Sequence, residues 1–398
     1  MRTPASWVNA WTSRPFYWDV EGPFVNSKSA KTLGLSAASL ALAAVCLAGP
    51  AHPQDPPAAT PWTRLDTLPS SRKQDDIFFV DPDVGWYVNG SGKIYQTRNG
   101  GASWKEQLSR PGTFFRCIGF LDEKHGFAGN LGPDYYPGVT DDNPLYETRD
   151  GGDTWSVVKV GAASIKGLCA IDIVTGNKHG TSGKDAKPVI YAGGRVGGPA
   201  ALIKSVDRGK TWESLDPGAD CGMILDVKFF DSDNGFLCAS TSADLRKSNA
   251  LILATADGGK TWSARYRSSR PYELTWKISF PSRDVGYVTL QSYDPSPEVS
   301  RRFVLKTVDG GKTWNELALV DDHACREFGV GFLDENTGWV GTGNQGYETR
   351  DGGKTWKPVA MGHAINKIRF IRSTGGTVAY AIGIEVLKMT LPPDKKGR

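Results

Sequence analysis

TVDGGKTW, at residues 307–314, is one of six copies of an eight-residue motif in this chain. The other copies are TRNGGASW (97–104), TRDGGDTW (148–155), SVDRGKTW (205–212), TADGGKTW (255–262) and TRDGGKTW (349–356). The third position of the motif recurs at intervals of 51, 57, 50, 52 and 42 residues. A nearly fixed period of this size indicates repeated supersecondary units, so this motif predicts the architecture before any other feature does.

Each copy, called a box below, has the chemistry of a tight turn between two strands. A short Asp side chain accepts hydrogen bonds from backbone N–H groups just ahead of it, and the Gly-Gly pair supplies positive φ angles. The Trp is expected to begin the next strand and to bury its ring while its indole N–H keeps a polar partner. We interpret the boxes as structural turns and not as ligand or metal loops. Their key residues are Asn99, Trp104, Asp150, Trp155, Asp207, Trp212, Asp257, Trp262, Asp309, Trp314, Asp351 and Trp356.

The shortest repeat predicts strands at 330–333, 339–342, 347–349 and 355–359, and four short antiparallel strands make a propeller blade. The first half of this pattern recurs at 77–86, 118–127, 227–236 and 278–287, and more weakly at 171–173. A seventh copy, at 368–388, has no box after it, whereas the segment 61–65 resembles an outer strand with Trp62 at the box-Trp position. We therefore predict an all-β, seven-bladed β-propeller over residues 61–391, closed by its N-terminal strand so that no sheet edge is left open.

The N-terminal segment predicts export. Residues 33–48 are almost wholly apolar or small and follow Lys28 and Lys31, which is typical of a signal peptide. We expect an N-terminal extension and signal peptide at 1–51, a linker at 52–60 and a C-terminal tail at 392–398. The protein would then be periplasmic or extracellular, with an uncleaved membrane anchor as the alternative.

Composition and cysteine spacing limit the kinds of ligand that we expect. A formal net charge of +4, with nearly balanced acids and bases, argues against nucleic acid. No Cys or Cys/His spacing suggests zinc, and we expect no metal, no cofactor and a monomer. An oxidising compartment permits disulfides, and Cys221–Cys238 is the favoured pair, because both residues are expected at the same end of one blade.

The topology divides the connecting loops between two faces. The turns after the first strands share one face with the boxes, the box face. The loops between second and third strands and the crossovers between blades share the other, the long-loop face. Loops at 129–146, 175–188, 240–249 and 292–302 are long and differ from one another. Because function concentrates on variable loops held by a rigid scaffold, we expect binding on the long-loop face.

This face combines Arg with Tyr and Trp, a composition that favours a protein partner although a solvated rim can share it. The predicted binding residues are Arg116, Tyr135, Tyr136, Arg267, Arg270, Trp276, Tyr293, Arg301, Arg302 and Arg326. A second group, on alternate positions of the first strands, is expected to approach the centre of the ring, where its mixed signs indicate internal ion pairing. These residues are Asp76, Asp172, Asp226, Lys228, Lys277, Lys367 and Arg369.

The consensus S/T-x-D-x-G-x-x-W resembles the Asp-box, or BNR, repeat of sialidases, sortilin-type receptors and the Ycf48/HCF136-like photosystem II assembly factors. Asn99 departs from it, and Arg208 departs from the Gly-Gly pair of the other copies. Residues 62–391 resemble the Ycf48/HCF136-like group best. The resemblance is close in residues 332–356, FLDENTGWVGTGNQGYETRDGGKTW. This resemblance implies an exported propeller that binds newly made photosystem II subunits through an arginine-rich surface. The insertions that begin at 129, 175 and 292 depart from its compact members.

The more distant sialidase resemblance implies an alternative. Sialidases use an arginine triad, a Tyr nucleophile activated by Glu, and an Asp acid/base. Phe115-Arg116-Cys117-Ile118 lacks the Pro of their Phe-Arg-Ile-Pro motif, and Tyr272-Glu273 is a Tyr-Glu pair outside the third strands. Since glycosidases need two carboxylates, Glu273 and Asp226 are the catalytic candidates of this alternative.

We predict a non-enzymatic interaction or assembly factor that binds an unidentified envelope protein, such as a membrane-complex subunit. The alternative is a glycan-active hydrolase of the sialidase or glucanase type on the same propeller.

Overall fold

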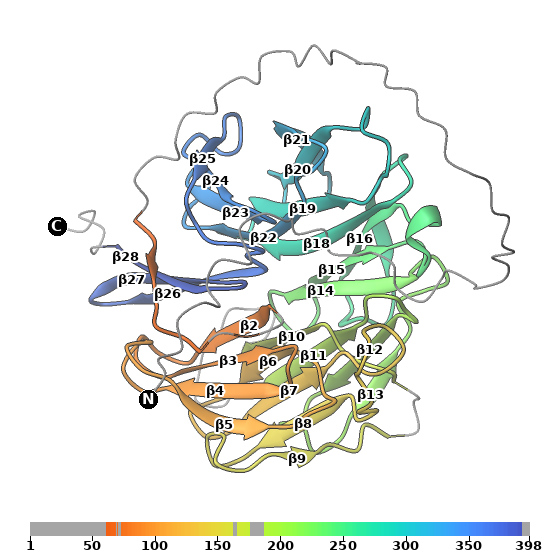
Figure 1. Cartoon of the computed structure of the whole chain (residues 1–398). Coiled ribbons are helices and arrows are strands. Elements are labelled where there is room, and N and C mark those ends of the chain that lie inside the picture. The colour runs from red at the N-terminus through yellow and green to blue at the C-terminus, as the bar shows by residue number, and fades with distance from the viewer. Residues whose placement is uncertain (1–60, 69, 71–72, 162–164, 176–186, 392–398) are drawn as a thin grey trace, which may run out of the picture. The chain divides into compact units, whose positions relative to one another are not determined.

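Strand pairing organises the chain into four-stranded antiparallel sheets, seven of them in the described residues. The structure is a computed structural model that describes residues 61–68, 70, 73–161, 165–175 and 187–391. The predicted signal peptide, linker and C-terminal tail, and most of the 175–188 loop, lie outside these residues. Figure 1 shows the sheets placed around one axis, with the first strand of each sheet innermost.

The first four sheets, blades 1 to 4, follow the chain in order. They are β2 (Gln74–Phe79), β3 (Gly85–Asn89), β4 (Lys93–Thr97) and β5 (Lys105–Ser109); β6 (Phe115–Phe120), β7 (Gly126–Asn130), β8 (Leu145–Thr148) and β9 (Ser156–Val157); β10 (Ala170–Thr175), β11 (Pro188–Gly194), β12 (Ala201–Ser205) and β13 (Glu213–Leu215); and β14 (Met223–Phe229), β15 (Gly235–Ser240), β16 (Ala250–Thr255) and β17 (Ser263–Arg267). A single 3-10 turn, η1 (Leu245–Lys247), interrupts the strands of the described residues, in the loop between β15 and β16.

Blades 5 to 7 complete the ring. They are β18 (Glu273–Ser279), β19 (Gly286–Ser292), β20 (Arg301–Thr307) and β21 (Asn315–Asp321); β22 (Glu327–Phe332), β23 (Gly338–Thr342), β24 (Gly346–Thr349) and β25 (Lys357–Val359); and β26 (Lys367–Ser373), β27 (Gly376–Ile382) and β28 (Val386–Leu391) with β1 (Thr63–Arg64). The first strands of neighbouring blades contact one another all the way round, and β2 contacts β26 and β27. The ring is therefore closed.

The N-terminal strand closes the ring as predicted. β1 pairs antiparallel with β28, with Thr63 opposite Lys388, and it begins one residue after Trp62. Trp62 is 5% exposed and packs edge-on against Trp339, with ring centroids 5.8 Å apart. The seven-bladed prediction is confirmed, and Trp62 takes the place of a box Trp.

The boxes are turns built from hydrogen bonds, as predicted. In the fifth box, the Thr307 hydroxyl accepts from the Gly311 N–H at 2.9 Å and donates to Asp309 Oδ1 at 2.8 Å. Asp309 Oδ1 also accepts from the Thr313 N–H at 3.0 Å. The same bonds recur in the other boxes, with Asn99 in place of Asp in the first.

Two expectations for the box Trp need correction. The outer strands begin one residue after the Trp and not at it, as in β5 after Trp104. Among the six box Trp residues, those whose indole N–H donates to a described residue are Trp212 and Trp262, to the carbonyls of Gly209 and Gly259 at 3.1 Å. Four other indole nitrogens are buried without a hydrogen bond to any described residue: those of Trp104, Trp155, Trp314 and Trp356. The ring's apolar packing is therefore what the motif requires.

Aromatic side chains on the second strands connect each blade to the next. The Trp86 ring stacks on Phe120 with centroids 3.6 Å apart, and its N–H donates to the carbonyl of Gly151, in the next box, at 3.0 Å. Tyr287 repeats this stacking on Phe332 at 3.4 Å, and its hydroxyl lies near the carbonyls of Glu335 at 2.7 Å and of Gly352, in the sixth box, at 3.3 Å. Each box is therefore packed into the interface between two blades.

Backbone bonds between boxes and first turns place both on one face, which confirms the predicted division of the loops. In blade 1 the Gly100 N–H donates to the Asp83 carbonyl at 2.9 Å, and in blade 2 the Gly151 N–H donates to the Lys124 carbonyl at 2.8 Å.

Within the residues that the structure describes, no helix is long and apolar enough to span a membrane.

Candidate functional site

The first strands carry a recurring β-bulge that directs side chains to the axis of the ring. Asp75 in β2, Arg116 in β6 and Leu225 in β14 are each an extra residue opposite a regular partner strand. In β18 both Trp276 and Lys277 lie opposite a single position of β19. Bulges re-aim side chains in this way next to functional sites. All five side chains are buried.

Charged side chains meet across the axis in a group that we call the axial cluster, which consists of Lys73, Asp75, Arg116, Asp226, Lys277 and Lys367. The Arg116 guanidinium bonds the Asp75 carboxylate and lies over the Trp276 ring, 4.9 Å from its centroid. On the other side, Asp226 accepts from Lys367 at 3.0 Å and faces Lys277 at 3.8 Å. The contacts join blade 2 to blade 5 and blade 4 to blade 7, so they cross the centre of the ring.

The predicted internal ion pairing is confirmed. Besides the Asp226 pairs, Arg369 meets Asp76 at 3.1 Å and Lys228 meets Asp172 at 3.4 Å. Buried charges need such partners because an unpaired charge in a low-dielectric interior is costly.

Burial and neighbouring cations shift the pKa values in the cluster. Burial, together with the Arg116 charge, lowers the pKa of Lys73 to about 7. Burial also lowers the pKa of Lys277. Burial alone would raise the pKa of Asp226, but Lys277 and Lys367 outweigh it and hold that pKa below its ordinary value. The basic side chains Lys73, Arg116 and Lys277 all lie over the Trp276 ring, with their charged atoms 5.5, 4.9 and 5.7 Å from its centroid.

Loops of the long-loop face cover the axial cluster with an apolar layer, which we call the axial cap. Tyr136 stacks on Phe114 with centroids 4.8 Å apart, and Tyr135 meets Tyr136 edge-on at 4.8 Å. The cap draws on blades 2, 3, 4, 5 and 7 and on the crossover into blade 7. Its members are Phe114, Leu131, Tyr135, Tyr136, Val139, Cys169, Val196, Met223, Leu225, Ala243, Leu245, Leu274, Trp276, Tyr293, Ala364 and Ile384.

A buried arginine and a half-buried aspartate hold the Tyr135 loop in place. Arg195, from blade 3, donates to the carbonyls of Leu131 at 3.1 Å and of Pro133, both in the blade 2 loop. Asp141 accepts from the hydroxyls of Thr113 and Tyr146. Burial would raise the pKa of Asp141, but these hydrogen bonds and those from Asn143 lower it to about 2. The loop is therefore anchored from both sides at neutral pH.

The structure brings only part of the predicted binding face together. Tyr135, Tyr136 and Tyr293 are half-buried members of the cap, and Arg326 lies over the Tyr293 ring at 5.4 Å. Arg301 is exposed.

Two other predicted arginines lie in salt bridges at the edge of blades 4 and 5. Arg267 bonds Asp220 at 2.6 Å, and Arg270 bonds Glu273 at 2.5 Å and Glu316 at 2.8 Å.

Three predicted surface residues are buried, and the prediction for them was wrong. Arg116 (4% exposed) lies in the bulge of β6, and Trp276 (5%) is the ring at the centre of the axial cluster. Arg302 (1%) donates to the carbonyls of Cys325 at 2.9 Å and Val299 at 2.8 Å. None of these three side chains is therefore on the surface, where a docked partner would contact it.

The catalytic candidates of the alternative hypothesis are buried. Asp226 is 1% exposed and held by two lysines, and Glu273 is 2% exposed and held by Arg270. Glu273 is the first residue of β18. Burial raises the pKa of Glu273, and Arg270 offsets part of that shift. Neither Asp226 nor Glu273 therefore offers a carboxylate that a substrate could reach.

The predicted disulfide is not formed. Cys221 and Cys238 are free and buried, as are the other three described cysteines. The register of β14 and β15 places Cys238 opposite Asp226, well along the strand from Cys221. The two thiols belong to separate apolar clusters, one toward blade 3 and one toward blade 5.

Sequence reasoning missed Lys73, Asp75 and Asn366. Asn366 accepts from Lys73 at 3.2 Å and from the Trp276 N–H at 2.8 Å. Each of these residues stands at or just before the start of a first strand, and a search of all such positions for polar residues would have found them.

Among the described side chains, no group of three His, Cys, Asp or Glu residues is placed to hold a metal ion.

The fold and this site define a class: a seven-bladed β-propeller whose axis is filled by ion pairs and covered by an aromatic cap. Within that class the chain resembles the Ycf48 proteins. "Photosystem II assembly lipoprotein Ycf48" of Synechococcus sp. (strain CC9902) is 24% identical over 299 residues, which cover 72% of this chain and 74% of that protein. No sequence-family profile matches the chain.

Solved structures agree on the fold. Ycf48 bound to a D1 peptide superposes with a TM-score of 0.59 at 17% identity, covering 84% of this chain and 98% of that one. Ycf48 from Cyanidioschyzon merolae gives 0.59 at 18%, covering 83% and 98%. The GH74 xyloglucanase from Xanthomonas campestris gives 0.57 at 13%, covering 82% of this chain but 53% of that one.

Proposed function

We propose that this chain is an exported, non-enzymatic assembly factor of the Ycf48 type that binds a segment of a membrane-complex protein on its long-loop face. The observation that carries this proposal is the axial cap, in which loops from separate blades bring Tyr135, Tyr136 and Tyr293 together over one point. Half-buried aromatic side chains beside an Arg are typical anchors of protein interfaces. A Ycf48 structure that holds a D1 peptide supports a peptide as the bound element.

The surface chemistry fits a peptide better than a substrate that must be cleaved. Tyr rings offer large contact area and few rotatable bonds to immobilise, so ordering them costs little on binding. Arg326 is held over Tyr293 by its bonds to the carbonyls of His323 and Cys325, at 3.0 and 3.3 Å. Its charge is therefore fixed in position beside the ring before any partner arrives.

The test is affinity capture of the exported domain against envelope membranes of its own source, with crosslinking mass spectrometry. We expect crosslinks from one membrane protein to the 131–144 and 292–302 loops. A Tyr135→Ser/Tyr136→Ser variant should reduce capture about tenfold or more, which corresponds to about 1.4 kcal/mol. Arg350→Ala, at an exposed box-face residue, is the matched control and should capture as the wild type does.

Two results would overturn the proposal. One is equal capture by the tyrosine variant when its melting temperature matches the wild type. The other is turnover of a glycoside in a broad substrate panel, lost in Glu273→Gln or Asp226→Asn, which would assign the hydrolase alternative instead.

A further inference from the structure

The first box differs in charge from boxes two and six, the two copies that also begin Thr-Arg. Counted from the residue just before each box, boxes two and six read Glu147-Thr148-Arg149-Asp150 and Glu348-Thr349-Arg350-Asp351, whereas box one reads Gln96-Thr97-Arg98-Asn99. The Thr and the Arg are kept, and both carboxylates are replaced by amides of the same shape. Asn99 still closes the turn, since its Oδ1 accepts from the Ser103 N–H at 2.9 Å. The replacement changes the electrostatics of the surface and leaves the fold intact.

The consequence is that Arg98 lacks the carboxylate that its counterparts have. Arg149 bonds Glu147 at 2.7 Å, and Arg350 bonds Glu348 at 2.9 Å, each with the residue two positions before it in the chain. The ion pair of Arg98 is with Glu123 of the neighbouring blade, at 4.0 Å, and both side chains are more than half exposed. An exposed pair at this distance contributes little, so the guanidinium is available for another anion.

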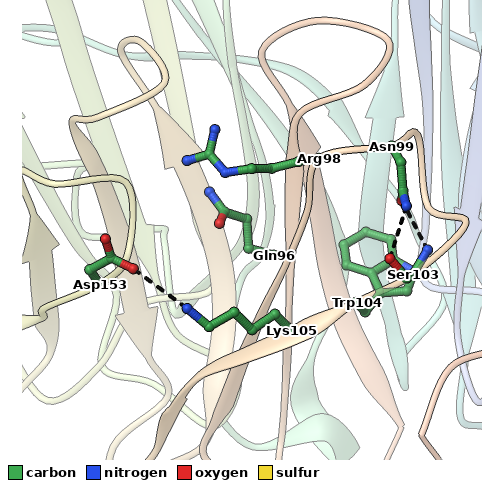
Figure 2. Close-up of a pocket in the computed structure, with 7 residues that line it drawn as sticks. All are labelled: Gln96, Arg98, Asn99, Ser103, Trp104, Lys105 and Asp153. Carbon is green, nitrogen blue, oxygen red and sulfur yellow. Dashed lines mark hydrogen bonds and ion pairs between the residues drawn. The ribbon is translucent and has the colours of Figure 1, made fainter.

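Arg98 lines a surface pocket of about 430 Å³ on the box face, between blades 1 and 2. Figure 2 shows Arg98, Gln96 and Lys105 on the blade 1 side, Asn99 and Ser103 at one end, and Asp153 at the other. Trp104 also lines the pocket. Gln96 is fixed there, because it donates to the Gly151 carbonyl at 3.0 Å and accepts from Gln107 at 2.8 Å.

The charges that face this pocket favour an anion. Arg98 and Lys105 contribute two positive charges and Asp153 one negative charge, so the lining is net positive. Lys105 lies 3.8 Å from Asp153, with the two side chains 74% and 69% exposed, so water screens this contact. Neither Asn99 nor Gln96 adds the negative charge that occupies these positions in boxes two and six.

We propose that this pocket binds the carboxylate of an acidic peptide. The planar Arg98 fork accepts a carboxylate through two parallel hydrogen bonds, Lys105 supplies a second cation, and the Trp104 ring offers apolar surface for the methylene groups of a Glu side chain. The site lies on the opposite face from the axial cap. It is therefore a second docking point that does not depend on the proposed function of the cap.

The test is a titration of the full chain, followed by the NMR resonance of the Trp104 indole N–H and by calorimetry. The probes are N-acetyl-tetraglutamate amide, its tetraglutamine counterpart and succinate. We expect the tetraglutamate probe to shift the Trp104 resonance and the tetraglutamine probe not to. Arg98→Gln should weaken binding about tenfold, because it removes a charge-assisted bidentate contact. Arg350→Gln, the same change at the counterpart in box six, should leave affinity within about twofold.

A second variant tests the idea without removing any cation. Gln96→Glu/Asn99→Asp gives box one the acid pattern of boxes two and six and should weaken binding as Arg98→Gln does. The proposal is overturned if the Trp104 resonance does not respond, or if Arg350→Gln and Arg98→Gln lose affinity equally. Succinate binding as tightly as the peptide probe would also overturn it, because the ligand would then be a free dicarboxylate.

Discussion

Thr307 shows how one hydroxyl holds a box together. Its side chain is fully buried, accepts from the Gly311 N–H and donates to Asp309. Thr307→Val keeps the side-chain volume but leaves that backbone N–H without its partner. We expect the variant to lose about 1–3 kcal/mol of unfolding free energy, the cost of an unsatisfied buried donor. Urea unfolding followed by Trp fluorescence measures it.

Thr313→Val in the same box is the matched control. Thr313 is exposed, and its hydroxyl donates to Asp309 Oδ2 at 2.6 Å where water can replace it. We expect a loss of less than about 0.5 kcal/mol. Equal losses in the two variants would mean that the buried hydroxyl has no special part in the turn.

The stability that each Asp-containing box gives to the folded chain depends on pH. Hydrogen bonds from the following Thr side chain and backbone lower the pKa of Asp309 from its ordinary value near 3.8 to about 2. The other box aspartates are lowered for the same reason: Asp150, Asp207, Asp257 and Asp351. Between these two pKa values the unfolded chain binds more protons than the folded chain. The stabilisation is therefore complete above pH 3.8 and is lost as the pH falls through 2.

Asp309→Asn tests this dependence, since Asn99 shows that the turn accepts Asn. We expect the variant to have a lower urea midpoint than the wild type at pH 7, because it lacks the ionised carboxylate, and the difference to shrink as the pH falls from 4 to 2. Asp66→Asn, at an exposed carboxylate outside the boxes, is the control and should follow the wild type. A variant as acid-sensitive as the wild type would count against a role for the box carboxylates.

The elements also show where sequence reasoning succeeds and where it fails. Boxes and strands follow from side-chain chemistry and period, both of which are local, so the blade pattern was predictable. A bulge is a shift in register against another strand, and no local pattern marks the extra residue. Arg116 and Trp276 were therefore placed on the surface, although the bulges of β6 and β18 direct them to the axis.

The outer strands carry bulges as well. Gln107 in β5, Arg265 in β17 and Leu319 in β21 are each an extra residue opposite the inner neighbour. These three strands are the longest outer strands in the described residues. A bulge on an exposed edge disturbs the backbone pattern that another chain would pair with. β-Bulges in the first strands thus direct side chains to the axis, and β-bulges in the outer strands disfavour pairing with another chain.

At the scale of the whole molecule, stability depends on closing the ring. The joint between blades 6 and 7 rests on Trp62, which lies before a strand of two residues and packs with Trp339, Val359, Ile368 and other apolar residues. Two residues of strand pairing alone would hold weakly, so the buried ring must supply most of the closing energy. The prediction of an orphan outer strand at 61–65 depended on recognising this Trp.

Trp62→Ala should therefore weaken the whole propeller and not only its terminus. We expect a loss of about 3–5 kcal/mol, the usual cost of truncating a buried Trp. Hydrogen exchange should rise in β28 and in the first strands on both sides of the joint. Leu68→Ala, at a residue 60% exposed, is the control and should change neither. Exchange that rises only in β1, with an unchanged urea midpoint, would show that the N-terminal strand is an accessory and that six blades and three strands hold together without it.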